Sequence, residues 1–230
     1  MTNATARVLD TRLLFSIIAA GIMSFSGVVV ETAMNVTFPT LMHEFGIGTS
    51  LVQWITTGYL LVLALIIPTS AYLKRRFATR TLFTTAIISF LAGTILSAWS
   101  PSFYVLLAGR LLQGVGTGIA LPLMFNIILE QVPGERLGFM IGVASLITAM
   151  APAVGPSLGG LIVSYFGWRM IFVSLLPFLL LSAALGIKSI RQAGTLEQEA
   201  RFNLPLYLLL IIGFSSLIFA TTLASSLGWR

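Results

Sequence analysis

Two ionisable side chains lie inside long apolar segments of this sequence, where a charge is costly. Glu31 lies in the run 13–37, and Arg110 lies in the run 103–130. At 1.5 Å of helix rise per residue, Glu31 is ~9 Å and Arg110 ~10 Å from the outer end of its run. A charge at the centre of a membrane helix costs at least ~2.5–3.5 kcal/mol, so such residues usually have a function.

The similar depth of Glu31 and Arg110 leaves three interpretations open. In the first, Glu31 binds and releases a proton or a cationic substrate, because burial and a nearby Arg act on a carboxyl pKa in opposite directions. In the second, the two residues form a structural ion pair that fixes two helices. In the third, Glu31 merely lies near the membrane interface.

Four further polar or aromatic side chains are candidates for the wall of a substrate cavity: Asn35, Tyr59, Gln113 and Asn126. Gln113 shares a helix face with Arg110 and can hydrogen-bond nearby, and Asn35 shares a face with Glu31. For Asn126 the alternative is a hydrogen bond that holds two helices together. For the tyrosine the alternative is an aromatic belt at the membrane interface.

A stretch rich in glycine and proline, residues 151–160, lies inside the apolar run 139–166. Membrane helices tolerate these residues, because neighbouring groups satisfy the freed backbone atoms. Glycine also lets a second helix approach closely. We expect a bent helix with a smooth face against which another helix packs. Gly114, Gly116 and Gly118, at alternate positions, likewise predict tight packing.

The composition excludes several classes of protein. Of the 230 residues, 57% are hydrophobic and 9% are charged, whereas soluble domains carry about 25% charged residues. The net charge of +6 is gathered in short clusters between apolar runs, which is typical of membrane-protein loops rather than of a nucleic-acid interface. With no Cys and one His, the chain offers no thiol chemistry and no His-rich metal site. We expect neither an enzyme nor a cofactor.

Seven apolar segments are long enough to cross a membrane as helices: 13–37, 51–73, 80–99, 103–130, 137–165, 169–188 and 204–225. With the N-terminus in the cytoplasm, ten of the 13 Lys and Arg residues fall in inner segments, as the positive-inside rule requires. Two fall in outer segments, and Arg110 is intramembrane. Glu44, in the outer loop after the first segment, is interpreted as a surface residue.

These segments predict an all-α membrane protein. Residues 1–12 form a cytoplasmic tail, residues 13–188 a six-helix domain, residues 189–203 a cytoplasmic linker, and residues 204–230 a seventh helix. The chain stops directly after this last helix, which predicts a fragment, or a chain that needs a second half.

Three motifs resemble those of one transporter family. Residues 110–116 (RLLQGVG) resemble a fourth-helix motif, residues 155–160 (GPSLGG) a fifth-helix antiporter motif, and residues 31–39 (ETAMNVTFP) a first-helix motif. Residues 167–169 (GWR) also fit the pattern. Together they resemble the N-terminal half of the major facilitator superfamily, specifically its drug:proton antiporters of the fourteen-helix branch.

The resemblance implies roles for individual residues. It links Arg110 to proton coupling and assigns an antiporter motif to Gly155, Pro156, Gly159 and Gly160. It implies a full transporter of twelve or fourteen helices, of which this chain holds the first six and one more. Its partners would be a lipophilic substrate, protons, the lipid bilayer, and a C-terminal half or a second chain.

Two departures of the chain from the family pattern affect the roles assigned to its residues. Val30 stands where the family usually has Asp, and the acid is the next residue, which turns it by about 100° around a helix. Arg75 replaces the Asp of the loop after the second helix, so the gating role of that Asp is not assigned here.

We therefore expect proton-coupled efflux of lipophilic or cationic compounds across the cytoplasmic membrane of a bacterium. One alternative is an exporter of a metabolite, peptide or lipid with the same fold. The other is a non-transporting half-protein that docks on a membrane partner.

Overall fold

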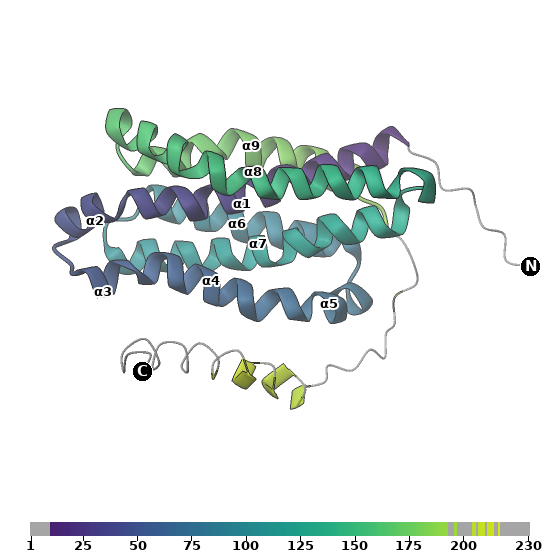
Figure 1. Ribbon diagram of the computed structural model, residues 1–230, viewed down its shortest axis with the longest axis horizontal. Coiled ribbons are helices and arrows are strands. Elements are labelled where there is room, and N and C mark those ends of the chain that lie inside the picture. The colour runs from purple at the N-terminus through teal and green to yellow at the C-terminus, as the bar shows by residue number, and fades with distance from the viewer. Residues whose placement is uncertain are drawn as a thin grey trace, which may run out of the picture.

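The computed structural model describes residues 10–192 and, beyond them, residues 196, 204–205, 207–209, 211–213 and 216. In this part of the chain every regular element is a helix, and the helices lie side by side in a bundle (Figure 1). Most of the predicted tail, linker and seventh helix falls outside the described residues. These three assignments therefore stay predictions.

Six described segments are long and apolar enough to cross a membrane. They are α1 (Thr11–Val36), α3 to α5 taken together (Thr49–Arg76), α6 (Thr79–Ala98), α7 (Phe103–Gln131), α8 (Gly134–Phe166) and α9 (Arg169–Ser189). Within the second segment, α3 is Thr49–Val52, α4 is Trp54–Ile66, the 3₁₀ turn η1 is Ile67–Thr69 and α5 is Ser70–Arg76. Each predicted boundary of the first six segments lies within three residues of the observed one. The chain is thus a multi-pass membrane protein.

One short helix, α2 (Phe38–Phe45), was not expected from the sequence. Pro39 lies in the first turn of this helix. The lack of an N–H group on proline is tolerated there, because N–H groups in the first turn have no carbonyl partner within the helix. Gly46 ends the helix with a φ of 62°, a conformation that glycine adopts without strain. At eight residues α2 is too short to cross a membrane, which is why a search for spanning segments missed it.

The six membrane-spanning segments pack in two groups of three, and each group combines helices from the first and the second half of the chain. Helix α1 packs against α8 and α9, whereas α7 packs against α4 and α6. Contacts of α1 with α7 and of α6 with α9 join the two groups. In sequence order, α1, α4 and α6 form the first half, and α7, α8 and α9 form the second half. The first helix of each half thus packs on the second and third helices of the other half. Repeated three-helix units of this kind are common in transporters.

The glycines of α7 lie at two different helix contacts. A Cβ atom on Gly114 would lie 3.0 Å from the carbonyl oxygen of Tyr59 in α4, and Gly118 also faces α4. A Cβ on Gly116 would lie 2.7 Å from the carbonyl oxygen of Ala86 in α6. Residues two apart point to nearly opposite sides of a helix, so alternate glycines let α7 fit closely between two neighbours. The prediction of tight packing is confirmed.

The glycine-rich stretch of α8 packs against α1. Gly155 and Gly159 are buried, whereas Pro152 and Pro156 are exposed within an unbroken helix. A Cβ on Gly159 would lie 2.8 Å from the Cβ of Ala33 and 3.0 Å from its carbonyl oxygen. The predicted smooth packing face is therefore present, and its partner is the helix that carries Glu31.

We expect Gly159→Ala to destabilise the protein by about 1–3 kcal/mol, because the added methyl group collides with the backbone of Ala33. The matched control is Gly142→Ala on the same helix, where a Cβ would have no neighbour within 4 Å. Since Ala favours a helix over Gly by about 0.5–1 kcal/mol, the control should not lose stability. Thermal denaturation in detergent measures both variants, and equal midpoints would contradict the close contact.

Candidate functional site

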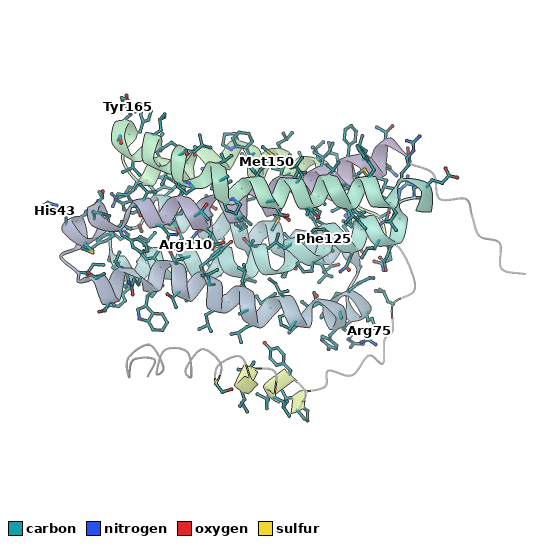
Figure 2. All side chains as sticks on the ribbon, in the orientation of Figure 1. His43, Arg75, Arg110, Phe125, Met150 and Tyr165 are labelled. Carbon is teal, nitrogen blue, oxygen red and sulfur yellow. The ribbon has the colours of Figure 1, made fainter. Side chains whose placement is uncertain are left out.

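Arg110 lies in the interior of the bundle, with 0% of its side chain exposed (Figure 2). Its Nη1 donates to Gln113 Oε1 at 2.7 Å, and its Nε donates to the carbonyl oxygen of Ile55 at 3.5 Å. The guanidinium carbon lies 4.3 Å from the centre of the Tyr59 ring, within the range of a cation–π contact. Nη2 has no hydrogen-bond partner among the described residues. The cation is thus fully enclosed but only partly paired.

Hydrogen bonds extend from this cation toward two further helices. Gln113 Nε2 donates to Thr94 Oγ1 at 2.8 Å, and Thr94 Oγ1 donates to the carbonyl oxygen of Phe90 at 2.8 Å. On the other side, the Tyr59 hydroxyl donates to the carbonyl oxygen of Gly27 at 3.0 Å. A row of polar contacts therefore crosses the bundle from α1 through α4 and α7 to α6. The predicted hydrogen bond between Gln113 and Arg110 is confirmed.

Glu31 lies half-buried on α1, one helical turn beyond Gly27. One turn further, Asn35 Oδ1 accepts a hydrogen bond of 2.9 Å from Thr56 of α4. Glu31 is thus flanked on its helix by two contacts between α1 and α4. Its charge interacts electrostatically with Arg110, but within the described part of the chain Glu31 forms no ion pair. A fixed ion pair between α1 and α7 is therefore not observed.

The shift of the acid by one position, from 30 to 31, has a clear structural consequence. Val30 is 0% exposed and belongs to the hydrophobic core. An acid at position 30 of this chain would be enclosed by apolar side chains. At position 31 the carboxylate reaches the partly open side of α1.

The four candidate cavity residues lie at different places in the structure. Tyr59 and Gln113 are fully buried in the row of polar contacts, and Asn35 is exposed on α1. Asn126 borders a small pocket at the other end of α7, beside Lys74, which forms an ion pair with Glu130. Along α7, Asn126 lies 13 residues, or about 20 Å, from Gln113. The role of the four residues in a substrate cavity stays a prediction, as does the antiporter role of Pro156 and Gly160.

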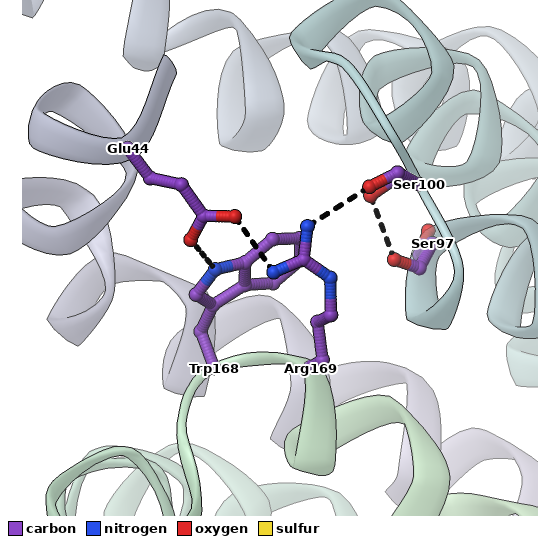
Figure 3. A network of polar contacts seen from close by, with 5 residues as sticks. All are labelled: Glu44, Ser97, Ser100, Trp168 and Arg169. Carbon is purple, nitrogen blue, oxygen red and sulfur yellow. Dashed lines mark hydrogen bonds and ion pairs between the residues drawn. The ribbon is translucent and has the colours of Figure 1, made fainter. Parts of the chain in front are cut away.

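A second polar cluster, at the outer end of the bundle, was missed by the sequence analysis (Figure 3). Trp168 Nε1 donates to Glu44 Oε2 at 2.6 Å, and Arg169 Nη1 donates to Glu44 Oε1 at 2.7 Å. Arg169 Nη2 also donates to the carbonyl oxygen of Ser100 at 3.0 Å. Glu44 is exposed, as expected for a surface residue, but its partners Trp168 and Arg169 were not predicted. The motif 167–169 is the only sequence signal that pointed to this place.

The cluster joins α2 to the start of α9 and to the connection between α6 and α7. Burial raises the pKa of Glu44, but the hydrogen bonds from Trp168 and Arg169 and the charge of Arg169 lower it further than burial raises it. The carboxylate is therefore held ionised, with its pKa below the ordinary range. Its two hydrogen bonds link the end of α2 to the start of α9.

Comparisons with known proteins agree with this architecture. The family profile of the Major Facilitator Superfamily matches residues 14–230. The chain is 40% identical to the lincomycin resistance protein LmrB of Listeria monocytogenes over 93% of this chain and 45% of that protein. It is 36% identical to a multidrug resistance protein B homolog of Mycobacterium tuberculosis over 64% of this chain and 27% of that protein. The chain thus spans less than half the length of these relatives.

Among solved structures, the fold is similar to that of a peptide transporter named POT, crystallised with sulfate. The TM-score is 0.68 at 16% identity, over 91% of this chain and 45% of that one. At this identity the likeness shows the fold alone. Together with the match along nearly the whole sequence, it identifies the six helices as half of a known transporter architecture. The chain belongs to the major facilitator superfamily.

Proposed function

We propose that this chain is the N-terminal half of a secondary transporter that exports lipophilic or cationic compounds in exchange for protons. The membrane would be the cytoplasmic membrane of a bacterium. Relatives named for lincomycin resistance and multidrug resistance support the export of drug-like compounds. The observation that carries the proton coupling is the enclosed Arg110, with one unpaired terminal nitrogen, in the electrostatic range of the half-buried Glu31.

In this proposal Glu31 is the residue that binds the proton. When Glu31 is ionised, its charge is attracted to Arg110, and the two side chains can approach each other. When a proton or a cationic substrate neutralises the carboxylate, that attraction is lost. Arg110 is enclosed between α4, α6 and α7, so a change in its charge partner acts on the contacts of all three helices. Alternating access then follows from rocking of the two halves of the transporter about the site.

The proton and the substrate exclude one another in this scheme, because both neutralise the same carboxylate. A proton that enters from outside releases a cationic substrate outward, and loss of the proton inside prepares the site again. Exchange of this kind needs no further cofactor. The C-terminal half, or a second chain in its place, provides the other wall of the substrate cavity.

The experiment uses inside-out membrane vesicles that contain the complete protein carrying this chain. Respiration acidifies the vesicle lumen, and lincomycin or ethidium is then added outside. We expect a substrate-dependent release of protons from the lumen together with uptake of the substrate, both abolished by a protonophore. Vesicles without the protein are the control. Substrate uptake that persists without a proton gradient would refute proton coupling.

A further inference from the structure

Thr94 of α6 lies at the far end of the hydrogen-bond chain that begins at Arg110, and it is not part of any motif described above. Its side chain is 0% exposed. Thr94 Oγ1 accepts a bond of 2.8 Å from Nε2 of Gln113, whose Oε1 accepts the bond of 2.7 Å from Arg110 Nη1. A residue of α6 is thus connected to the buried cation through a single intervening side chain.

Each bond in this chain can run in only one direction. The guanidinium of Arg110 carries donors only, so Gln113 must present its oxygen to Arg110 and its NH₂ group to Thr94. The Thr94 hydroxyl is free to accept, because its own proton is donated to the carbonyl oxygen of Phe90 at 2.8 Å. Thr side chains in helices commonly donate to the carbonyl group four residues back. The chain of bonds from the cation therefore ends on the backbone of α6.

Two glycines bring α6 close enough to α7 for this contact. A Cβ atom on Gly93 would lie 2.5 Å from the carbonyl oxygen of Gly109 and 2.8 Å from the backbone nitrogen of Gln113. A Cβ on Gly109 would lie 2.8 Å from the carbonyl oxygen of Gly93. The absence of side chains lets the two helices approach closely at this level. The position of Thr94 relative to Gln113 is therefore fixed by the packing of two backbones.

The anchored amide of Gln113 determines where the guanidinium of Arg110 lies. Gln113 holds Nη1, the carbonyl oxygen of Ile55 accepts from Nε, and the Tyr59 ring lies 4.3 Å from the guanidinium carbon. The charge of Glu31 acts on this guanidinium from α1. If Gln113 turned away, Nη1 would lose its acceptor and the guanidinium could rotate. Its distance from Glu31 would change, and with it the electrostatic interaction, which varies inversely with distance.

We propose that Thr94 is a positioning residue for proton coupling: through Gln113 it holds the guanidinium of Arg110 at the place from which it responds to the charge of Glu31. This role rests on the proposed function. It gives α6 a part in coupling, although the only charged residue of that helix is Arg80, near its start. Thr94 contacts neither the proton nor the substrate in this proposal, so its loss weakens coupling without abolishing it.

Three variants of the complete protein carrying this chain test the role of Thr94. Thr94→Val keeps the shape of the side chain but removes the acceptor for Gln113, whereas Thr94→Ser keeps the hydroxyl. Thr84→Val is the matched control on the same helix, because the Thr84 hydroxyl also donates to the carbonyl oxygen four residues back, that of Arg80, at 2.8 Å. Gel filtration checks that each variant is folded, and Thr94→Ala replaces Thr94→Val if the latter is not.

Transport is measured in inside-out vesicles with ethidium. We expect proton-driven uptake per folded molecule to fall about two- to tenfold in Thr94→Val, the range that corresponds to one hydrogen bond. Uptake in Thr94→Ser and Thr84→Val should stay near that of the unmodified protein. Exchange of labelled for unlabelled ethidium, which needs no proton, should be unchanged in all three variants.

Solid-state NMR of protein with nitrogen-labelled arginine, in liposomes, tests the position of Arg110 without transport. A guanidinium whose Nη1 is held and whose Nη2 is not gives two separate Nη signals, and fast rotation merges them. The signals of Arg110 are identified by their absence from Arg110→Met. We expect two signals in the unmodified protein and in Thr94→Ser, and one averaged signal in Thr94→Val.

Several results would overturn the proposal. Uptake in Thr94→Val equal to that of the unmodified protein, or two separate Arg110 signals in that variant, would show that Thr94 does not position the cation. Equal losses in Thr94→Ser and Thr94→Val, or equal losses of exchange and of proton-driven uptake, would show a role in packing alone. Failure of the proposed function is recognised separately, because proton-driven uptake would then be absent from the unmodified protein, and the role of Thr94 in coupling would fall with it.

Discussion

Replacing Glu31 with Gln is expected to reduce proton-driven efflux to the background of cells without the transporter. Gln has almost the shape of Glu but stays neutral at every pH. The variant therefore resembles the protonated carboxyl group permanently and cannot alternate between two charge states. Because Glu31 forms no ion pair with a described residue, its replacement should leave the thermal midpoint within about 2 °C.

Two measurements separate loss of coupling from loss of the protein. Efflux driven by a proton gradient should disappear, whereas exchange of labelled for unlabelled uncharged substrate, which needs no proton, should remain. Glu135→Gln is the matched control, since it makes the same change at an exposed acid near the start of α8. Proton-driven efflux that survives in Glu31→Gln at normal expression would remove Glu31 from the mechanism.

The membrane-spanning helices could be predicted from the sequence because their signals are local. Six predicted segments end within three residues of the observed ends. Their positions follow from hydropathy and from the polar and charged residues that separate the apolar runs. The hydrogen bond from Arg110 to Gln113 follows from helix geometry alone, because three residues separate them on one helix.

Features that depend on distant parts of the chain could not be predicted. Glu44 lies 124 residues from Trp168 and 125 from Arg169, and no regular spacing relates a side chain to partners so far along the chain. The helices that pack against the glycine-rich faces could not be predicted either. The sequence does not indicate which helix contacts Gly159, and in the structure it is α1, at Ala33. The partner of the Tyr59 hydroxyl, the carbonyl oxygen of Gly27 on α1, lies 32 residues away in the chain and likewise could not be predicted.

Replacing Arg110 with Met is the second change for which we expect a large effect, and it separates a structural role from a functional one. The guanidinium is fully buried, yet Nη2 has no partner and the bond from Nε is long, at 3.5 Å. Such a cation contributes little to stability, because its incomplete hydrogen bonding does not offset the free-energy cost of removing the charge from water. Replacing buried charges with apolar groups of similar volume is often neutral or stabilising, by up to about 1–4 kcal/mol.

We therefore expect Arg110→Met to keep or raise the thermal midpoint while proton-driven efflux falls to the background of cells without the transporter. The variant leaves Gln113 Oε1 without its donor, but Gln113 keeps its bond to Thr94, which limits the cost. Arg136→Met, at an exposed Arg near the start of α8, is the matched control and should retain efflux. If Arg110 is instead a structural element, the opposite pattern follows: the midpoint of Arg110→Met drops by several degrees, and efflux per folded molecule is unchanged. The paired measurement of stability and coupling thus decides whether the partly paired cation serves the fold or responds to the proton.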